Sequence, residues 1–82
     1  MILQFRHRGK APTLDEVRAL FGLQPDEVDA DFGVVATDPA DGLYVIRVDE
    51  RAAAKLRVAL AARPDDPAEG LFADPPIEPF HP

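Results

Sequence analysis

The chain has 82 residues, a formal net charge of −6 and no cysteine. A chain of this length forms one domain with a thin core, and without cysteine it has no disulfides, thiolate nucleophiles or cysteine-ligated metal sites. The negative charge disfavours nucleic acid as a partner, because affinity for phosphate backbones comes from Lys and Arg. No stretch approaches the roughly 20 apolar residues of a membrane span, and Met1–Lys10 lacks the apolar run of a signal peptide, so we expect a cytoplasmic protein with no membrane partner.

The N-terminal segment Met1–Arg8 predicts a strand. Its side chains alternate between two faces, and Leu3 and Phe5 mark the face expected to meet the core. The residues that follow, Gly9–Pro12, are typical of a break between elements.

A helix is predicted over Leu14–Phe21. Thr13 and Glu16 have the spacing of a capping box, in which each side chain accepts a hydrogen bond from the other residue's backbone N–H. Gly22 is typical of the left-handed residue that ends a helix. Pro25–Val28 predicts one further turn, because proline suits a first helical position and acids suit a helix start.

The middle of the chain predicts a β-hairpin. Two β-rich runs, Phe32–Thr37 and Leu43–Asp49, flank a five-residue connection in which Pro39 favours a type I turn and Gly42 permits a positive φ at its exit. The second strand has apolar residues on both faces. One face carries Tyr44, Ile46 and Val48, and the other carries Leu43 and Val45.

The last third predicts a helix, a short strand and an extended ending. Asp49 is a candidate N-cap for a helix over Glu50–Ala62, which Pro64 ends. Leu71–Ala73 predicts an edge strand. From Pro75 to Pro82 the prolines disfavour sheet pairing and favour extended polyproline geometry.

These elements predict an α+β fold of ferredoxin-like type. The order β-α-β-β-α-β is that of a split βαβ unit, in which an antiparallel sheet carries two helices on one face. We expect residues 1–74 to form this single domain and residues 75–82 to form an extended, proline-rich tail.

No catalytic or metal-binding constellation is recognised in the sequence, and no cofactor is expected. The two histidines, His7 and His81, have no evident nucleophilic partner, and Thr13 is better explained as a helix cap. Four acids lie close together in the chain, at Asp26, Glu27, Asp29 and Asp31. Their spacing lacks the pattern of a calcium loop, and turn formation explains them better than metal binding.

Two features favour binding of a protein over catalysis. A sheet with helices on one side leaves its other face open, so one apolar set of the second hairpin strand is covered either by the tail of the same chain or by a partner. The tail itself carries isolated apolar residues between prolines, which suits an extended groove. The alternative is that Ile77 and Phe80 pack on their own sheet.

The order of the elements and the extended ending resemble the propeptide-like inhibitors of subtilisin-type serine proteases. The resemblance implies that the open sheet face docks on a serine protease through Leu43 and Val45. It also implies that the tail enters the protease cleft. The expected contact residues of the tail are Ile77, Glu78, Pro79, Phe80 and His81.

The leading hypothesis is therefore a small protein-interaction domain, non-enzymatic, that inhibits such a protease as a monomer or weak homodimer. The alternative is a regulatory or accessory subunit, which includes acidic antagonists that mimic nucleic acid. That alternative predicts salt-sensitive binding through the acids of Asp26–Asp31.

Overall fold

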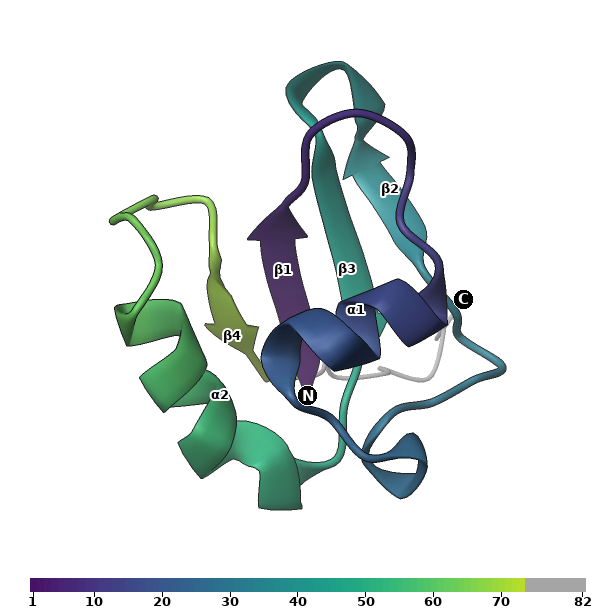
Figure 1. Cartoon of the computed structure of the whole chain (residues 1–82), viewed down its shortest axis with the longest axis vertical. Coiled ribbons are helices and arrows are strands. Elements are labelled where there is room, and N and C mark those ends of the chain that lie inside the picture. Colours follow the sequence, from purple (N-terminus) through teal and green to yellow (C-terminus); the bar gives the residue numbers. More distant parts are fainter. Residues whose placement is uncertain (74–82) are drawn as a thin grey trace, which may run out of the picture.

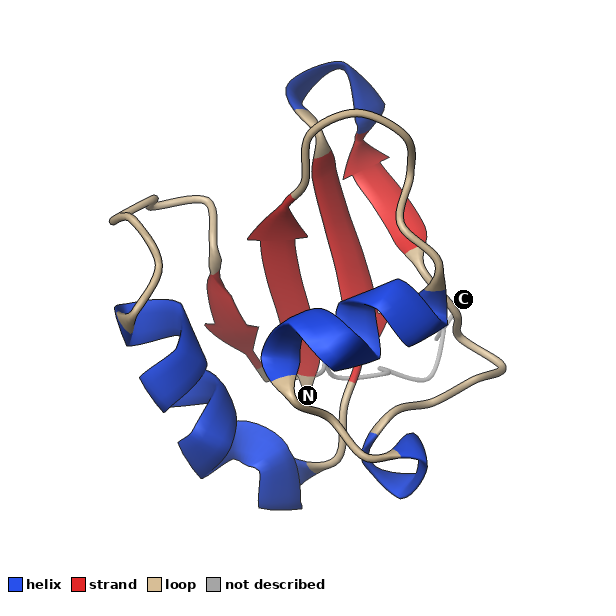
Figure 2. Cartoon of the chain, viewed as in Figure 1, coloured by secondary structure: helices blue, strands red, loops and turns tan. Residues whose placement is uncertain are grey.

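A computed structural model describes residues 1–73 of the chain. These residues form four strands and two α-helices in the order β-α-β-β-α-β (Figures 1 and 2). The strands are β1 (Ile2–Arg6), β2 (Val35–Asp38), β3 (Leu43–Arg47) and β4 (Gly70–Phe72). The helices are α1 (Leu14–Phe21) and α2 (Ala53–Ala61), and short 3₁₀ turns lie at Pro25–Glu27, Pro39–Asp41 and Glu50–Ala52.

The strands form one antiparallel sheet in the order β2-β3-β1-β4. The central strand β1 pairs with β3 on one side and with β4 on the other, so Leu3 lies opposite both Ile46 and Leu71. Helix α1 crosses the sheet in front of β1 and β3, and α2 lies on the side of β4 (Figure 1). The expectation of a small α+β fold with an antiparallel sheet and two helices is confirmed.

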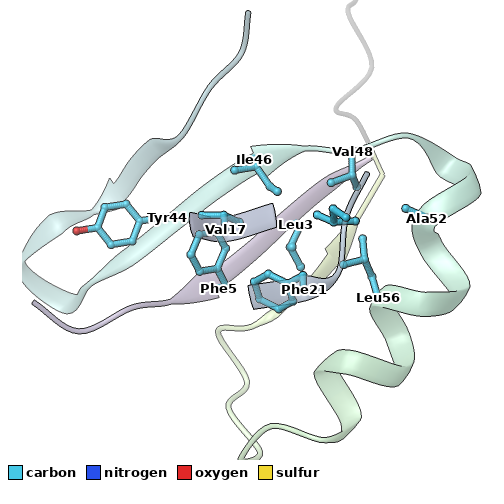
Figure 3. Packing of buried hydrophobic residues seen from close by; sticks show 10 residues of the cluster. Leu3, Phe5, Val17, Phe21, Tyr44, Ile46, Val48, Ala52 and Leu56 are labelled. Atoms are coloured by element: carbon cyan, nitrogen blue, oxygen red, sulfur yellow. The ribbon is translucent and has the colours of Figure 1, made fainter. Parts of the chain in front are cut away.

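The core lies between the sheet and the two helices (Figure 3). Leu3 and Phe5 project from β1 and are fully buried, as the alternation of the first strand predicted. Phe5 contacts Phe21 of α1 edge to face, with ring centroids 5.5 Å apart. The other buried members of the cluster are Val17, Leu23, Tyr44, Ile46, Val48, Ala52 and Leu56.

Helix α1 has the bounds that its sequence predicted. The N–H of Glu16 donates to Oγ1 of Thr13 at 3.1 Å, and the N–H of Thr13 donates to Oε1 of Glu16 at 3.0 Å. Gly22 ends the helix in the left-handed conformation, with φ 66°. Local interactions therefore define both ends of this helix.

The first hairpin strand begins later than predicted. It was expected over Phe32–Thr37, but β2 spans Val35–Asp38. The carboxylate of Asp29 accepts hydrogen bonds from the N–H groups of Asp31 and Phe32, and Gly33 has φ 66°. This turn and the left-handed glycine are incompatible with extended pairing, so the strand begins after them.

The second predicted helix begins with a 3₁₀ turn instead of an α-helical one. The carboxylate of Asp49 accepts a hydrogen bond from the N–H of Arg51 at 2.8 Å, and the backbone carbonyl of Asp49 accepts one from the N–H of Ala52 at 3.0 Å. These i+2 and i+3 bonds tighten the first turn, so α2 proper starts at Ala53.

The first and last predicted strands are close to the observed β1 and β4. β1 is shorter than Met1–Arg8, and β4 is displaced by one residue from Leu71–Ala73. The predicted tail, Pro75–Pro82, lies outside the described residues. Within residues 1–73, no helix is long and apolar enough to cross a membrane.

Candidate functional site

The sheet face opposite the helices is the candidate functional site, and we call it the open face. Tyr44 and Ile46 of β3 belong to the core, so the residues that alternate with them, Leu43, Val45 and Arg47, project to the other side. Residues directly opposite each other in paired strands share a face. The register therefore adds Ile2 and Gln4 from β1, Val35 from β2 and Phe72 from β4 to the open face.

The apolar residues of the open face become more exposed toward the edges of the sheet. Val45 lies in the central part and is only 8% exposed, and Leu43 is half-buried. Val35 on one edge strand is 42% exposed, and Phe72 on the other is 49% exposed. The open face thus has apolar side chains at both edges that helices do not cover.

Polar side chains fix the backbone around these apolar residues. Nε2 of Gln4 donates to the carbonyl oxygen of Ala68 at 2.7 Å, which ties β1 to the loop before β4. On the other side of β1, the hydroxyl of Thr37 in β2 lies 3.5 Å from Oε1 of Gln4. Gln4 therefore connects β2 to the loop before β4 across the open face.

A cluster of ion pairs holds β4 against β1. Nε of Arg6 lies 2.7 Å from Oδ2 of Asp66, and this hydrogen bond lowers the pKa of the carboxyl. The N–H of Arg6 also donates to Oε2 of Glu69 at 2.8 Å. These contacts hold the loop before β4 beside β1 and add to the three-residue pairing of β4 with β1.

The structure places only part of the predicted site. Leu43 and Val45 both lie on the open face, where alternation put them. Ile77, Glu78, Pro79, Phe80 and His81 lie outside the described residues. Sequence reasoning missed Val35 and Phe72 as members of this face. Alternation within a strand shows which residues share a face, but it does not show which face that is. The pairing register places Val35 and Phe72 on the open face.

Thr13 lies at the start of α1, and His7 lies just after β1. The hydroxyl of Thr13 caps α1, as expected. His7 follows β1, and its ring lies 6.4 Å from that of Tyr44 in an edge-on arrangement. Nδ1 of His7 is buried and has no hydrogen-bond partner among residues 1–73.

The clustered acids line a hollow of about 420 Å³ beside the loop 26–31 and residues 47–49. Several of them are already engaged. Oε1 of Glu27 lies 2.6 Å from Nζ of Lys55, and this hydrogen bond lowers the pKa of Glu27. Asp29 caps its own turn, and Asp26 lies near Arg51. Glu27 and Asp29 thus act as helix-start and turn residues, as the sequence suggested.

Within residues 1–73, no group of three or more His, Asp or Glu side chains is arranged to hold a metal ion. No protein-family model, curated protein or solved structure matches the chain significantly. The physical character of the open face is therefore the basis for assigning a function.

Proposed function

We propose that this chain is a protein-interaction domain that docks on its partner through the open face of its sheet. The observation that carries this proposal is the exposure of Val35 and Phe72 at the two edges of that face, 42% and 49%, on either side of the apolar Val45. Apolar surface that a small domain leaves uncovered beside charged groups is typical of an interaction site.

The partner that we propose is a subtilisin-type serine protease, with the chain acting as an inhibitor of the propeptide type. The element order and the strand order β2-β3-β1-β4 support a ferredoxin-like arrangement, which such inhibitors share. The second support is that the chain continues past β4 into an apolar, proline-rich sequence, Pro75–Pro82.

The proposed mechanism is competitive occupancy of the protease cleft. The open face supplies affinity by burying apolar area, at about 25 cal/mol for each Å² removed from water. The tail residues Ile77 and Phe80 fill substrate pockets. Pro79 and Pro82 hinder hydrolysis, because a proline next to a potential scissile bond restricts the backbone and removes an N–H donor.

Inhibition of a panel of subtilisin-type proteases tests this function directly. The full chain is expected to inhibit at least one member competitively. A chain truncated after Asp74 is expected to lose inhibition and keep nearly the same melting temperature. A large fall in melting temperature on truncation would mean that the tail is part of the folded domain, and inhibition that survives truncation would refute the role of the tail.

A matched pair of variants tests the open face separately from the tail. Phe72→Gln removes an apolar side chain from the open face, and Val58→Gln removes one from the exposed side of α2, where Val58 is 72% exposed. We expect at least tenfold weaker inhibition for Phe72→Gln and no change for Val58→Gln. Equal effects of the two variants would rule out docking through the open face.

The second candidate function is an acidic antagonist or accessory subunit that binds a basic surface. The carboxylates around the hollow at residues 26–31 favour it, since they gather negative charge in one place. It ranks second because Glu27 is paired with Lys55 and Asp29 caps a turn. Raising the salt concentration from 0.05 to 0.5 M shortens the Debye length about threefold, so binding through these acids would weaken steeply. Binding through the apolar open face would not.

A further inference from the structure

The loop between β1 and α1 carries two exposed cations. Arg8 and Lys10 lie on either side of Gly9, and we call these three residues the basic loop. All three residues are exposed. Neither cation forms an ion pair or a side-chain hydrogen bond with another residue that the structure describes. The charges of the basic loop are therefore available to another molecule.

The acids nearest to Arg8 are bound by other arginines or lie apart from it. Arg8 lines a hollow of about 370 Å³ at this end of the sheet. The acids that line the hollow with it are Asp65, Asp66 and Glu69. Arg6 binds Asp66 at 2.7 Å, and Arg63 binds Glu69 at 2.8 Å. None of the three acids forms an ion pair with Arg8, so its charge is not neutralised by direct contact.

A second hollow, of about 400 Å³, lies between the basic loop and the turn of the hairpin. Arg8 and Gly9 line it on one side, and Pro39–Gly42 line it on the other. The loop and the turn lie side by side at the same end of the sheet (Figure 1). The carboxylate of Asp41 lies 3.8 Å from Nη1 of Arg6, and its carbonyl accepts a hydrogen bond from the same nitrogen at 2.7 Å. The acid in this wall is therefore also engaged, and the hollow has room for a side chain next to Arg8.

We propose that the basic loop binds an acidic segment of a partner protein, in which two or more carboxylates contact Arg8 and Lys10. A chain with net charge −6 repels an acidic partner as a whole, so such a partner approaches where the local charge is positive. Among the described residues, Arg57 is the one other Lys or Arg without a side-chain partner, and it lies by itself on α2. Two unpaired cations occur together only in the basic loop of residues 1–73.

An acidic segment fits the basic loop better than a small free anion does. Both cations are exposed, so the loop does not enclose a bound phosphate. Carboxylates joined in one chain can contact both cations, because the first contact raises the effective concentration for the second. Exposed ion pairs are individually weak, so we expect a dissociation constant of about 1 mM at low salt. The contact lies outside the open face and does not depend on the proposed protease partner.

Titration of the full chain with capped hexaglutamate tests this contact, with the amide NMR signals of residues 8–10 as the readout. At about 0.02 M salt, hexaglutamate is expected to shift these signals, and at about 0.5 M salt the shifts should largely disappear. Hexaglutamine has the same length without the charge and should produce no shift. Shifts that hexaglutamine reproduces, or that are absent from residues 8–10, would overturn the proposal.

Arg8→Gln and Arg57→Gln form a matched pair of variants, because each removes one exposed arginine and the same charge. Arg8→Gln should weaken hexaglutamate binding about threefold or more, and Arg57→Gln should change the dissociation constant by less than about 1.5-fold. Equal weakening would show that the peptide responds to net charge alone, which would refute a site at the basic loop. Inorganic phosphate is the second probe. If phosphate binds residues 8–10 as tightly as hexaglutamate does, the loop is a small-anion site and an acidic segment is the wrong occupant.

Discussion

The guanidinium of Arg63 binds the carboxylate of Glu69 through two hydrogen bonds. Nη2 lies 2.8 Å from Oε2 and Nε lies 3.0 Å from Oε1, so the pair is bidentate. The side chain of Glu69 is only 7% exposed, and the Arg63 guanidinium also lies over the ring of Phe21 at 5.2 Å. This pair connects the segment after α2 to the start of β4 and to α1.

Removal of the Glu69 carboxylate should destabilise the domain. Glu69→Ala leaves the guanidinium of Arg63 and the N–H of Arg6 without this acceptor. We expect the free energy of unfolding to fall by about 1–3 kcal/mol, measured by urea denaturation. Asp65→Ala is the control, because Asp65 is exposed and forms no ion pair within residues 1–73. It should change stability by less than about 0.5 kcal/mol.

The same cluster should make stability depend on pH in the acid range. The hydrogen bond from Arg6 lowers the pKa of Asp66 below its ordinary value of 3.8. Burial raises the pKa of Glu69, but hydrogen bonds from Arg63 and from the N–H of Arg6 outweigh it, so the net pKa lies below 4.5. A carboxyl whose pKa is lower in the folded state contributes stability above its unfolded pKa, and that contribution disappears as pH falls through the folded pKa.

The contribution of this cluster to stability should therefore be fully present above about pH 5 and should decrease as pH falls below about 4.5. Asp66→Asn removes one of the titrating groups, so this variant should lose less stability between pH 5 and pH 3 than the unmodified chain does. Urea midpoints across this pH range check this expectation. A profile for Asp66→Asn parallel to that of the unmodified chain would contradict the assignment.

The sequence predicted best those elements whose bounds depend on neighbouring residues. Helix α1 was predicted at both ends because Thr13, Glu16 and Gly22 lie within a turn of the residues that they cap. The start of β2 was wrong because it depends on a turn centred on Asp29 and on the left-handed Gly33, and the apolar residues around that glycine resemble a strand. The apolar pattern alone does not distinguish a strand from a turn that contains apolar residues.

The candidate site was predictable only within a single strand. Alternation placed Leu43 and Val45 on one face, but their neighbours on that face come from strands distant in sequence. Val35 lies opposite Val45, and Phe72 lies opposite Ile2 on the far side of β1. Pairing register depends on interactions between distant segments, so a reading along the chain does not identify these neighbours.

Two glycines with the same backbone conformation should differ in their tolerance of alanine. Gly22 and Gly42 have φ 66° and φ 68°, respectively, so each substitution carries the left-handed cost of about 1–2 kcal/mol. A Cβ at Gly22 would meet no atom within 4 Å, whereas one at Gly42 would lie 2.6 Å from the carbonyl oxygen of His7.

Gly42→Ala should therefore destabilise the domain more than Gly22→Ala does, by at least about 1 kcal/mol. The additional cost is the clash with the backbone of His7, just after β1. That backbone is held close to the hairpin turn, because the N–H of His7 donates to the carbonyl of Gly42 at 2.8 Å. Thermal unfolding of the two variants measures the difference. Equal melting temperatures would show that the backbone at His7 moves freely enough to accept a methyl group.

The alanine-rich helix α2 provides a test of which side packs on the sheet. Leu56 is fully buried and belongs to the core, whereas Val58 is 72% exposed two residues later. Leu56→Ala should cost about 2–5 kcal/mol, because it removes buried methyl groups and leaves a cavity. For a domain of this size, whose total stability is about 4–12 kcal/mol, such a loss is large.

Val58→Ala should change stability by less than about 0.5 kcal/mol, since its side chain is mostly in water and alanine is a better helix former. Comparable losses in the two variants would mean that α2 packs through a different side, and the core between α2 and β1 would then be assigned incorrectly.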